Sequence, residues 1–383
     1  MTAPQRLDAV CELTMGQAPD GESYNNDGEG LPLIAGAGDF GDVHPAVKKF
    51  TTAPGKICRP GDVILGIRAT IGEKVTADGA YCLGRGVAGL RARAGLDSRY
   101  LWHWLTHVTP ILAAKAKGAT FTQVNREDIG ELPIRLPPAS EQQRIAGVLD
   151  RAEVLRAKRR VALAQLDTLT QSIFLDMFGD PATNPRGWPG RTIADICEVR
   201  GGKRLPKGKE YSPTPTSYRY IRVTDLRSGT VNESALVYLK PEVQASIERY
   251  IVNTGDVIIS IAGSIGLIAP VPLSLDGANL TENAAKLVPR RRGEYDACFL
   301  AVLLQTPSAQ RQIRSYVGQV TIGKLALFRI EMIHVPIPPF PLQRDFACRV
   351  AQVEKLKATY RAALTDLDAL FVSLQHRSFR REL

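Results

Sequence analysis

The sequence lacks the features that mark membrane proteins and disulfide- or zinc-stabilised proteins. No apolar run reaches the roughly 18 residues that span a bilayer, and the longest candidate, residues 257–268, is interrupted by Ser260, Gly263 and Ser264. The N-terminal segment has no basic stretch followed by an apolar one, so we expect no signal peptide. The six cysteines form no C-x-x-C pair, which favours reduced thiols over a disulfide framework or a zinc site. We therefore expect a cytoplasmic chain with no membrane partner.

Motifs for catalysis are equally scarce. Neither D-x-K nor E-x-K occurs, and the two Pro-Pro pairs, 137–138 and 338–339, do not form the [D/N/S]-P-P-[aromatic] loop of adenine methyltransferases. The segment Gly318–Leu325 reads G-x-x-x-x-G-K-L, without the Ser or Thr that a phosphate-binding loop needs for Mg²⁺. His103 and His107 have an i, i+4 spacing, which we interpret as ordinary helix packing. We expect no catalytic residue, no metal site and no cofactor bound by this chain.

The charge of the chain is large and unevenly distributed. The 383 residues carry a net charge of +10, and at about 150 residues per domain the length suggests two or three domains. Residues 1–138 and 139–180 are each neutral, whereas residues 181–338 carry +7 and residues 339–383 carry +3. This distribution favours a polyanionic partner, held mainly by the third segment.

The sequence repeats itself at half its length. GDVILGIRATIG at 61–72 matches GDVIISIAGSIG at 255–266, and the segment from Glu141 matches the segment from Leu342 at a constant offset of 201. We interpret the repeated Gly-Asp as a hairpin turn, with paired carboxylates as the alternative. The order is globular domain, long helix, globular domain, long helix. The predicted boundaries are 1–138, 139–180, 181–338 and 339–383.

Two long helices are the clearest secondary-structure prediction. Apolar residues recur at steps of three and four from Ile145 to Ile173, with eight of nine positions apolar, and the same positions plus 201 repeat the pattern. Such a seam predicts a coiled coil in which the two helices pair antiparallel. Prolines precede both helices, and Ser140 is a plausible N-cap of the first one, which we expect to end at Phe178. The alternative is that each helix packs on its own globular domain.

The globular domains read as mixed helix and sheet. Short buried strands are predicted after each Gly-Asp turn, and helices and surface loops follow from apolar periodicity and from Gly, Pro, Ser and Asn content. The strands are expected at 63–67 and 257–261, the helices at 98–108, 113–117, 297–306 and 309–317, and the loops at 19–30 and 206–216.

The entry into the first long helix, LPIRLPPASEQQRI at 132–145, and its exit, FGDPATNPRGWP at 178–189, resemble a known family. Together with the alternating plan, they resemble the specificity (S) subunit of type I restriction–modification systems. The second helix entry departs from this pattern, because Leu342 stands where the first entry has Glu141. The resemblance implies an α/β (α+β) fold. It has two target recognition domains of mixed sheet plus helices, separated by two long antiparallel coiled-coil helices with pseudo-twofold symmetry.

The resemblance also implies a function. Each recognition domain would read half of a split, asymmetric site in double-stranded DNA. The helices would set the spacing of the halves and dock two adenine methyltransferase subunits, and through them the restriction subunits. The chain itself would be non-catalytic, while S-adenosylmethionine, ATP and Mg would serve the partner subunits. Two alternatives stay open: a self-contained bipartite DNA-binding regulator without methyltransferase partners, and a structural coiled-coil scaffold.

Candidate DNA-binding residues are polar in the neutral first domain and basic in the second. Arginine and lysine contact phosphates and guanine edges, and amides and hydroxyls contact bases. In the first domain the candidates are Thr14, Gln17, Asn25, Asn26, Lys48, Lys49, Arg68, Thr120, Gln123 and Asn125. In the second domain they are Arg200, Lys203, Arg204, Lys207, Lys209, Arg222, Thr224 and Arg227.

Overall fold

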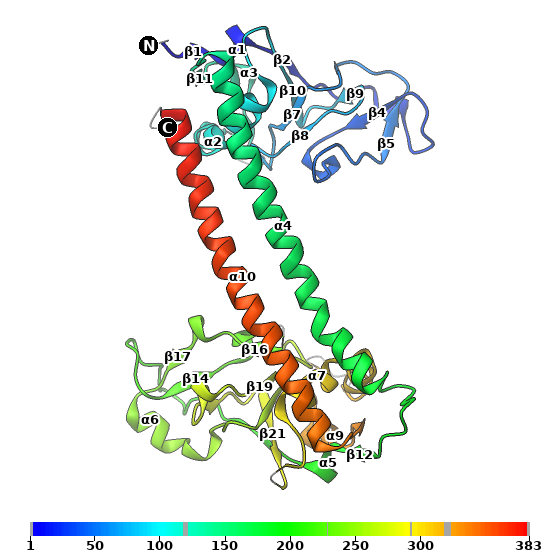
Figure 1. Cartoon of the computed structure of the whole chain (residues 1–383), viewed down its shortest axis with the longest axis vertical. Coiled ribbons are helices and arrows are strands. Elements are labelled where there is room, and N and C mark those ends of the chain that lie inside the picture. The colour runs from blue at the N-terminus through cyan, green and yellow to red at the C-terminus, as the bar shows by residue number, and fades with distance from the viewer. Residues whose placement is uncertain (1–2, 118–121, 228, 292, 318–322, 381–383) are drawn as a thin grey trace. The chain divides into compact units, whose positions relative to one another are not determined.

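The chain divides into two compact units. The computed structural model describes residues 3–117, 122–227, 229–291, 293–317 and 323–380. Unit 1 comprises residues 1–160 and 362–383, and unit 2 comprises residues 161–361. Each unit therefore combines one globular domain with a segment of each of the two long helices, α4 (Ala139–Phe178) and α10 (Phe340–Arg380) (Figure 1).

Unit 1 is built on a four-stranded antiparallel sheet in the order β2-β10-β7-β8. A second sheet has the order β3-β5-β4-β9-β6, and β1 pairs with β11. The strands are β1 (Gln5–Arg6), β2 (Cys11–Met15), β3 (Tyr24–Asn25), β4 (Leu31–Ile34), β5 (Lys49–Thr51), β6 (Ile57–Cys58), β7 (Val63–Gly66), β8 (Lys74–Thr76), β9 (Tyr81–Leu83), β10 (Val87–Ala92) and β11 (Pro133–Ile134). The shorter helices are α1 (Leu7–Val10), α2 (Ser98–Ala114) and α3 (Arg126–Gly130).

Unit 2 repeats this plan with the four-stranded sheet β13-β21-β18-β19. Smaller sheets have the orders β17-β14-β20, β15-β16 and β12-β22. The strands are β12 (Gly190–Thr192), β13 (Cys197–Gly201), β14 (Arg219–Ile221), β15 (Leu226–Arg227), β16 (Thr230–Val231), β17 (Val237–Tyr238), β18 (Val257–Ser260), β19 (Ile268–Pro270), β20 (Asn279–Leu280), β21 (Ala284–Pro289) and β22 (His334–Pro336). The helices are α5 (Ile193–Ile196), α6 (Pro241–Ser246), α7 (Ala297–Gln305), α8 (Pro307–Ser315) and α9 (Leu327–Glu331).

The strand ladders of the two units share one register. Met15 lies opposite Ala88 in unit 1, and Gly201 lies opposite Ala285 in unit 2. The parallel pair β4–β9 likewise corresponds to β14–β20. The duplication seen in the sequence is therefore a duplication of strand order and pairing.

Both Gly-Asp dipeptides close turns, as predicted. The Asp62 carboxylate accepts a hydrogen bond from the Arg59 backbone N–H at 2.8 Å, and Asp256 accepts one from the Asn253 backbone N–H at 2.9 Å. Both carboxylates are buried, and each has a basic partner from its sheet. They act within separate units, one in each repeat.

The long helices are anchored by apolar residues that enter the core of each unit. In unit 1, Ile145, Leu149 and Ala152 of α4 join Phe371 of α10 in the core. In unit 2, the long helices are anchored by an aromatic cluster. Its ring centroids lie 4.9–6.4 Å apart, and its members are Phe174, Phe178, Phe299 and Phe346.

Each unit has an ion pair between α4 and α10 whose two residues are related to those of the other unit by the same offset of 201. In unit 1, Arg156 Nε lies 2.5 Å from Asp368 Oδ1, and the guanidinium covers the Phe371 ring at 4.4 Å. In unit 2, Lys357 Nζ lies 3.2 Å from Asp167 Oδ1. Each unit therefore contains its own pairing of an α4 segment with an α10 segment.

Four leucines of the predicted apolar seam are exposed within their own units. Leu155 and Leu169 of α4 are 53% and 38% exposed, and Leu356 and Leu370 of α10 are 43% and 50% exposed. Within each unit, burial concentrates where the helices meet the globular domain, so the alternative of helices packing on their own domains describes much of the apolar contact. Periodicity alone could not separate the two cases, because both require apolar residues at the same spacing.

Several predicted boundaries also shift. Helix α2 runs to Ala114 and includes Pro110, so no separate helix forms at 113–117. Proline removes one helical hydrogen bond, but the buried face of Leu101, Trp104, Leu105, Val108 and Leu112 holds the helix together. Helix α4 begins at Ala139, which places Ser140 inside the first turn instead of at the cap.

Two further observations concern the chain as a whole. Among the described residues, no helix is long and apolar enough to cross a membrane. All six cysteines are free, and burial raises the pKa of the Cys11 and Cys197 thiols to about 12. Both of these thiols are therefore protonated and weakly nucleophilic near neutral pH.

Candidate nucleic-acid interface

The backbone of unit 2 is drawn tightly together where β13, β14 and β21 meet. We call this place the Gly202 junction. The Gly202 N–H donates to the Ala284 carbonyl at 3.0 Å, the Lys203 N–H to Leu280 at 2.8 Å, and the Thr281 N–H to Ile221 at 3.0 Å. A Cβ on Gly202 would lie 2.1 Å from the Thr281 carbonyl oxygen, so this close approach requires glycine.

An open groove lies beside the Gly202 junction. It has a volume of about 990 Å³ and is lined by residues of three segments. These are Arg204, Leu205, Lys209, Glu210, Tyr211, Ser212, Pro213, Tyr220, Arg222, Val223, Thr224, Thr281, Glu282 and Asn283. A second depression of about 680 Å³ shares Arg204 and Glu282 with the first and adds Lys203 and Lys324. We refer to the two together as the unit 2 groove. It carries five basic and two acidic side chains.

The groove brings together five of the eight residues predicted for this domain. Lys203, Arg204, Lys209, Arg222 and Thr224 all line it. The remaining three do not line the groove. Lys207 is exposed in the same loop, Arg200 lies on β13, and Arg227 lines a separate depression of about 200 Å³.

Several of these side chains already have partners within the protein. Arg222 forms two hydrogen bonds with the carboxylate of the buried Asp225, at 2.8 and 3.1 Å, and a third with the Ala235 carbonyl at 2.7 Å. Arg204 pairs with Glu282 at 3.1 Å, although 76% of its side chain is exposed. Arg200 pairs with Glu198 at 2.6 Å. Arg222 is therefore primarily a structural residue, whereas Arg204 is exposed enough to exchange partners.

Two tyrosines give the groove an aromatic wall. Tyr211 and Tyr220 have ring centroids 5.7 Å apart. Burial raises the pKa of Tyr220 to about 12, so its hydroxyl remains protonated and donates to the Lys203 carbonyl at 2.8 Å. The hydroxyl thereby fixes the start of the basic loop 203–209, while the half-exposed Tyr211 ring faces solvent.

The candidates of unit 1 are dispersed. Asn25 is used locally, because its amide oxygen accepts from the backbone N–H groups of Asp27 and Glu29, and its amide nitrogen donates to the Glu29 carbonyl. Asn125 caps α3 through a hydrogen bond from the Asp128 N–H at 2.8 Å. Arg68 and Gln123 are brought together as a β-bridge.

The other unit 1 candidates differ in exposure. Thr14 is partly buried on β2, and Gln17 is exposed two residues beyond the end of this strand. Asn26, Lys48 and Lys49 are exposed, whereas Thr120 lies outside the described residues. Residues 318–322 of the glycine-containing segment are also outside them.

Residues 18–47 of unit 1 carry six acidic side chains and no lysine or arginine. Asn25 and Asn26 lie in this acidic segment, of which Asp20, Glu22, Asp27 and Glu29 are exposed. Such a loop repels phosphates at short range.

Tyr211, Glu282 and Lys324 line the unit 2 groove but were not predicted from the sequence. Tyr211 lies inside the loop 206–216 that was predicted to be a surface loop, so its position was within reach. Glu282 and Lys324 come to the groove only through the pairing of distant strands and the bridge between Ala262 and Lys324. No local pattern carries that information.

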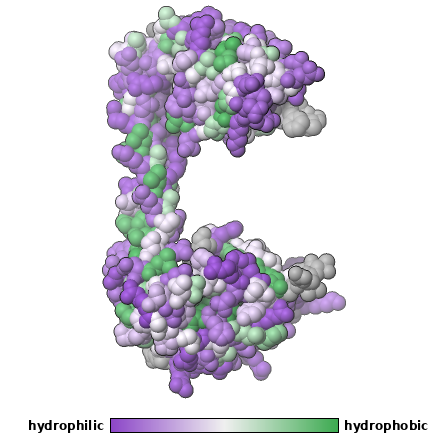
Figure 2. Space-filling view, turned by 90° about the vertical axis from the view of Figure 1, so that its right-hand side faces the viewer, coloured by the Kyte–Doolittle hydropathy of each residue, from purple (hydrophilic) through white to green (hydrophobic). Residues whose placement is uncertain are grey.

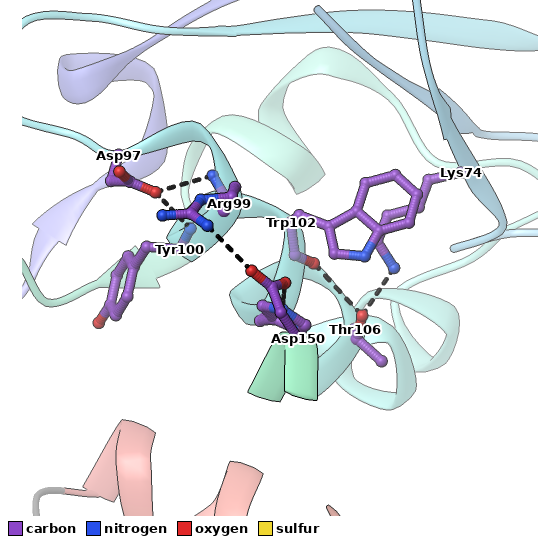
Figure 3. Close-up of polar contacts among 8 residues, drawn as sticks. Lys74, Asp97, Arg99, Tyr100, Trp102, Thr106 and Asp150 are labelled. Carbon is purple, nitrogen blue, oxygen red and sulfur yellow. Dashed lines mark hydrogen bonds and ion pairs between the residues drawn. The ribbon is translucent and has the colours of Figure 1, made fainter. Parts of the chain in front are cut away.

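The globular domain of unit 1 is attached to α4 by a polar cluster (Figure 3). The Arg99 guanidinium points toward the Asp150 carboxylate at 3.2 Å, and the buried His103 Nε2 lies 2.7 Å from the same carboxylate. Gln142 of α4 is buried and accepts a hydrogen bond from the backbone N–H of Asp97, the N-cap of α2.

The same glutamine contact occurs in unit 2. Gln343 accepts a hydrogen bond from the Asp296 N–H at 2.9 Å and donates to the Pro338 carbonyl at 2.8 Å. Asp296 is the N-cap of α7, just as Asp97 is the N-cap of α2. The residue that the two helix entries share structurally is this glutamine, and the exchange of Glu141 for Leu342 leaves it unchanged.

Hydrophilic residues cover most of the visible surface of the globular domains, with hydrophobic residues interspersed along the long helices (Figure 2). The exposed apolar residues of α4 and α10 are Val154, Leu155, Val161, Leu169, Leu175, Leu342, Leu356, Leu370 and Val372. Such residues mark a protein-binding surface where they form a contiguous patch, and they are ordinary where they are scattered singly.

A family model described as "Type I restriction modification DNA specificity domain" matches residues 3–160 and 185–365. The chain belongs to this family. The two matched segments correspond to the two repeats, so the family model matches both globular domains. Among the residues that the structure describes, no group of three or more His, Cys, Asp or Glu side chains could hold a metal ion.

Individual relatives agree with the family assignment. The chain is 22% identical over 417 residues to the type I restriction enzyme EcoBI specificity subunit of Escherichia coli, covering 98% of this chain and 85% of that subunit. It is 30% identical to the MjaX specificity subunit of Methanocaldococcus jannaschii over 163 residues, which cover 42% of this chain and 38% of that subunit. The solved S subunit from M. genitalium shares the fold, with a TM-score of 0.59 at 17% identity over 98% of this chain and 95% of that one.

Proposed function

We propose that this chain is the DNA-specificity subunit of a type I restriction–modification complex. In this proposal each unit contacts one half of a split, asymmetric site in double-stranded DNA. The observation that carries the proposal is the unit 2 groove, where basic side chains and an exposed tyrosine ring surround a rigid backbone junction in a chain of this family. The duplicated sheet supports two readers, and their different side chains support two different half-sites.

The chain is non-catalytic in this proposal. It binds no cofactor itself, and S-adenosylmethionine, ATP and Mg serve the partner subunits. Two methyltransferase subunits dock on the exposed apolar residues of α4 and α10, and restriction subunits join through them. Family membership supports these partners and the cytoplasmic location, and the exposed helix residues are the feature of this chain that supports docking.

Salt dependence tests DNA contact by the unit 2 groove. Each phosphate contact that is lost lowers the slope of log affinity against log salt by about 0.9. Changing Lys203, Lys207 and Lys209 together to alanine should therefore reduce the slope by up to about three, since all three are exposed. Binding of the full chain to a random-sequence duplex across a salt series provides the measurement. Changing Lys56, Lys158 and Lys355, which are exposed and are not candidate DNA-binding residues, is the matched control. Equal slopes for the two triple variants would remove the support for this interface.

The proposed role of α4 in spacing the half-sites has its own test. Helix α4 is continuous over 40 residues, so four residues inserted after Thr168 add about 6 Å of helix and slightly more than one turn. We expect both half-sites to be read unchanged, with a spacer longer by one or two base pairs. Genome-wide mapping of methylation in cells that contain the partner subunits measures this. An unchanged spacer at full activity would contradict the role.

The alternative of a self-contained DNA-binding regulator is tested with the purified chain, with and without the methyltransferase subunit. A self-contained regulator would bind its bipartite site tightly when purified alone, and it would gain no modification activity when the methyltransferase is added. We expect the opposite: adenine modification that depends on both the chain and the methyltransferase subunit.

A further inference from the structure

Arg85 in unit 1 occupies the position of Glu282 in unit 2. In unit 1 the Gly16 N–H donates to the Val87 carbonyl at 3.0 Å, and the Gln17 N–H donates to the Leu83 carbonyl at 2.8 Å. In unit 2 the same two hydrogen bonds join Gly202 to Ala284 and Lys203 to Leu280. The residue midway between the two acceptors is Arg85 in one unit and Glu282 in the other. The same backbone position therefore carries opposite charges.

Arg85 projects from a rigid turn. It is exposed, whereas every other residue from Tyr81 to Leu90 is buried. The flanking glycines are fixed to β4: the Gly84 N–H donates to Ile34 at 2.8 Å, and the Gly86 N–H donates to Ala35 at 3.1 Å. A Cβ on Gly86 would lie 2.3 Å from the Ala35 carbonyl oxygen, so the turn has no room to rearrange.

The Arg85 side chain is available for a ligand. It forms no hydrogen bond or ion pair with any residue that the structure describes. Backbone hydrogen bonds place two of the predicted residues beside this turn. The Gln17 N–H donates to the Leu83 carbonyl, and Arg68 directly follows Ile67, whose N–H donates to the Gly86 carbonyl at 3.0 Å. In unit 2, by contrast, Glu282 holds Arg204. The unit 1 turn is therefore a basic position in a domain whose segment 18–47 is acidic.

Resting on the function proposed above, we propose that Arg85 reads a guanine in the half-site of unit 1. Arginine donates two hydrogen bonds to guanine O6 and N7, and the rigid backbone fixes the position from which the Arg85 side chain extends. Glutamate at the same position of unit 2 cannot donate, and it accepts from cytosine N4 instead. One backbone platform with opposite charges thus directs the two readers to different bases and contributes to the asymmetry of the site.

The test uses the full chain co-expressed with its methyltransferase partner, with modified adenines mapped across the genome by single-molecule sequencing. The variants are Arg85→Ala, Arg85→Gln and Glu282→Gln, and Arg59→Ala is the control because Arg59 is also an exposed arginine of unit 1. We expect Arg85→Ala to lower discrimination at one guanine of one half-site by about tenfold or more, with the other half-site unchanged. Glu282→Gln should relax a position in the opposite half-site, and Arg59→Ala should leave the motif intact.

The outcomes separate the inference from the function on which it rests. A wild-type complex without a bipartite motif overturns the proposed function. A bipartite motif that Arg85→Ala leaves unchanged overturns only the inference, as does a loss of modification that is uniform over all sequences and therefore indicates a phosphate contact. Thermal melting establishes that each variant is folded, and Arg85→Gln, which retains three side-chain carbons and a polar end but lacks the guanidinium, gives the answer if the alanine variant unfolds.

Discussion

A single methyl group at the Gly202 junction should destabilise the chain strongly. In Gly202→Ala the new Cβ would lie 2.1 Å from the Thr281 carbonyl oxygen and 2.4 Å from that of Leu280, whereas an ordinary contact is at least 3.4 Å. The backbone would have to separate by about 1 Å, because both obstacles are main-chain atoms. That movement would stretch the hydrogen bonds that join Gly202 to Ala284 and Lys203 to Leu280.

The expected cost follows from these two effects. Forcing an extra carbon into a packed site costs about 1–3 kcal/mol, and each weakened hydrogen bond costs about 1 kcal/mol more. A total near 3 kcal/mol corresponds to a decrease in Tm of about 6–12 °C for a unit of this size. Gly16→Ala should behave alike, since its Cβ would lie 2.0 Å from the Gly84 carbonyl oxygen.

Thermal unfolding of the full chain, followed by circular dichroism, measures the effect. Gly190→Ala in unit 2 and Gly21→Ala in unit 1 are the controls, because a Cβ at either position meets no atom within 4 Å. If Gly202→Ala melts within 1 °C of Gly190→Ala, where about 6 °C or more is expected, the junction is not rigid and the argument for a fixed platform fails.

Three further predictions concern other parts of the units. Arg222→Ala should lower the free energy of unfolding by about 2 kcal/mol, because it leaves the buried Asp225 carboxylate without its charged partner; a loss of DNA affinity at unchanged Tm would show instead that Arg222 contacts DNA. Gln343→Ala should cost about 2–3 kcal/mol in thermal unfolding, since two buried backbone groups lose their partner, and a neutral result would contradict the proposed anchoring. Burial lowers the pKa of Lys74 to about 8 from 10.5, so the unfolded chain binds more protons than the folded chain between pH 8 and 10.5. The free energy of unfolding should therefore rise with pH over that window, by up to about 3 kcal/mol relative to Lys74→Met. Parallel pH profiles of the two proteins in denaturant titrations would refute this.

The fold was predictable from the sequence to the extent that it is written in local patterns. The two long helices, the strands after each Gly-Asp turn and the repeat all follow from periodicity and turn residues. The lengths of the helices were nearly right because prolines precede both helices, and Gly179, with a positive φ, directly follows the end of α4. The partner of each apolar helix face was not predictable, since a seam for another helix and a face for a globular domain have the same spacing.

The candidate site was predictable only in part. The basic loop 203–209 was found because its charges are consecutive, and Tyr211 lay within a predicted loop. Arg222 was assigned to DNA because nothing local shows that its guanidinium holds Asp225. Arg85 was missed, although a charged residue between two glycines in an apolar stretch is a recognisable sign of a turn that presents a side chain. Its importance depends on strand register, which the sequence does not display.

The two junctions have a consequence for how specificity can change during evolution. The hydrogen bonds that fix Gly16 and Gly202 run between main-chain atoms, and no side chain takes part in them. Positions 85 and 282 can therefore exchange arginine, glutamate or any other residue without loss of the framework that presents them. Natural selection can alter the residue at such a position by single substitutions while the rest of the domain stays constant. A domain built in this way keeps its fold while the residue that we propose to contact the base changes. A new base preference can therefore arise without a variant that fails to fold.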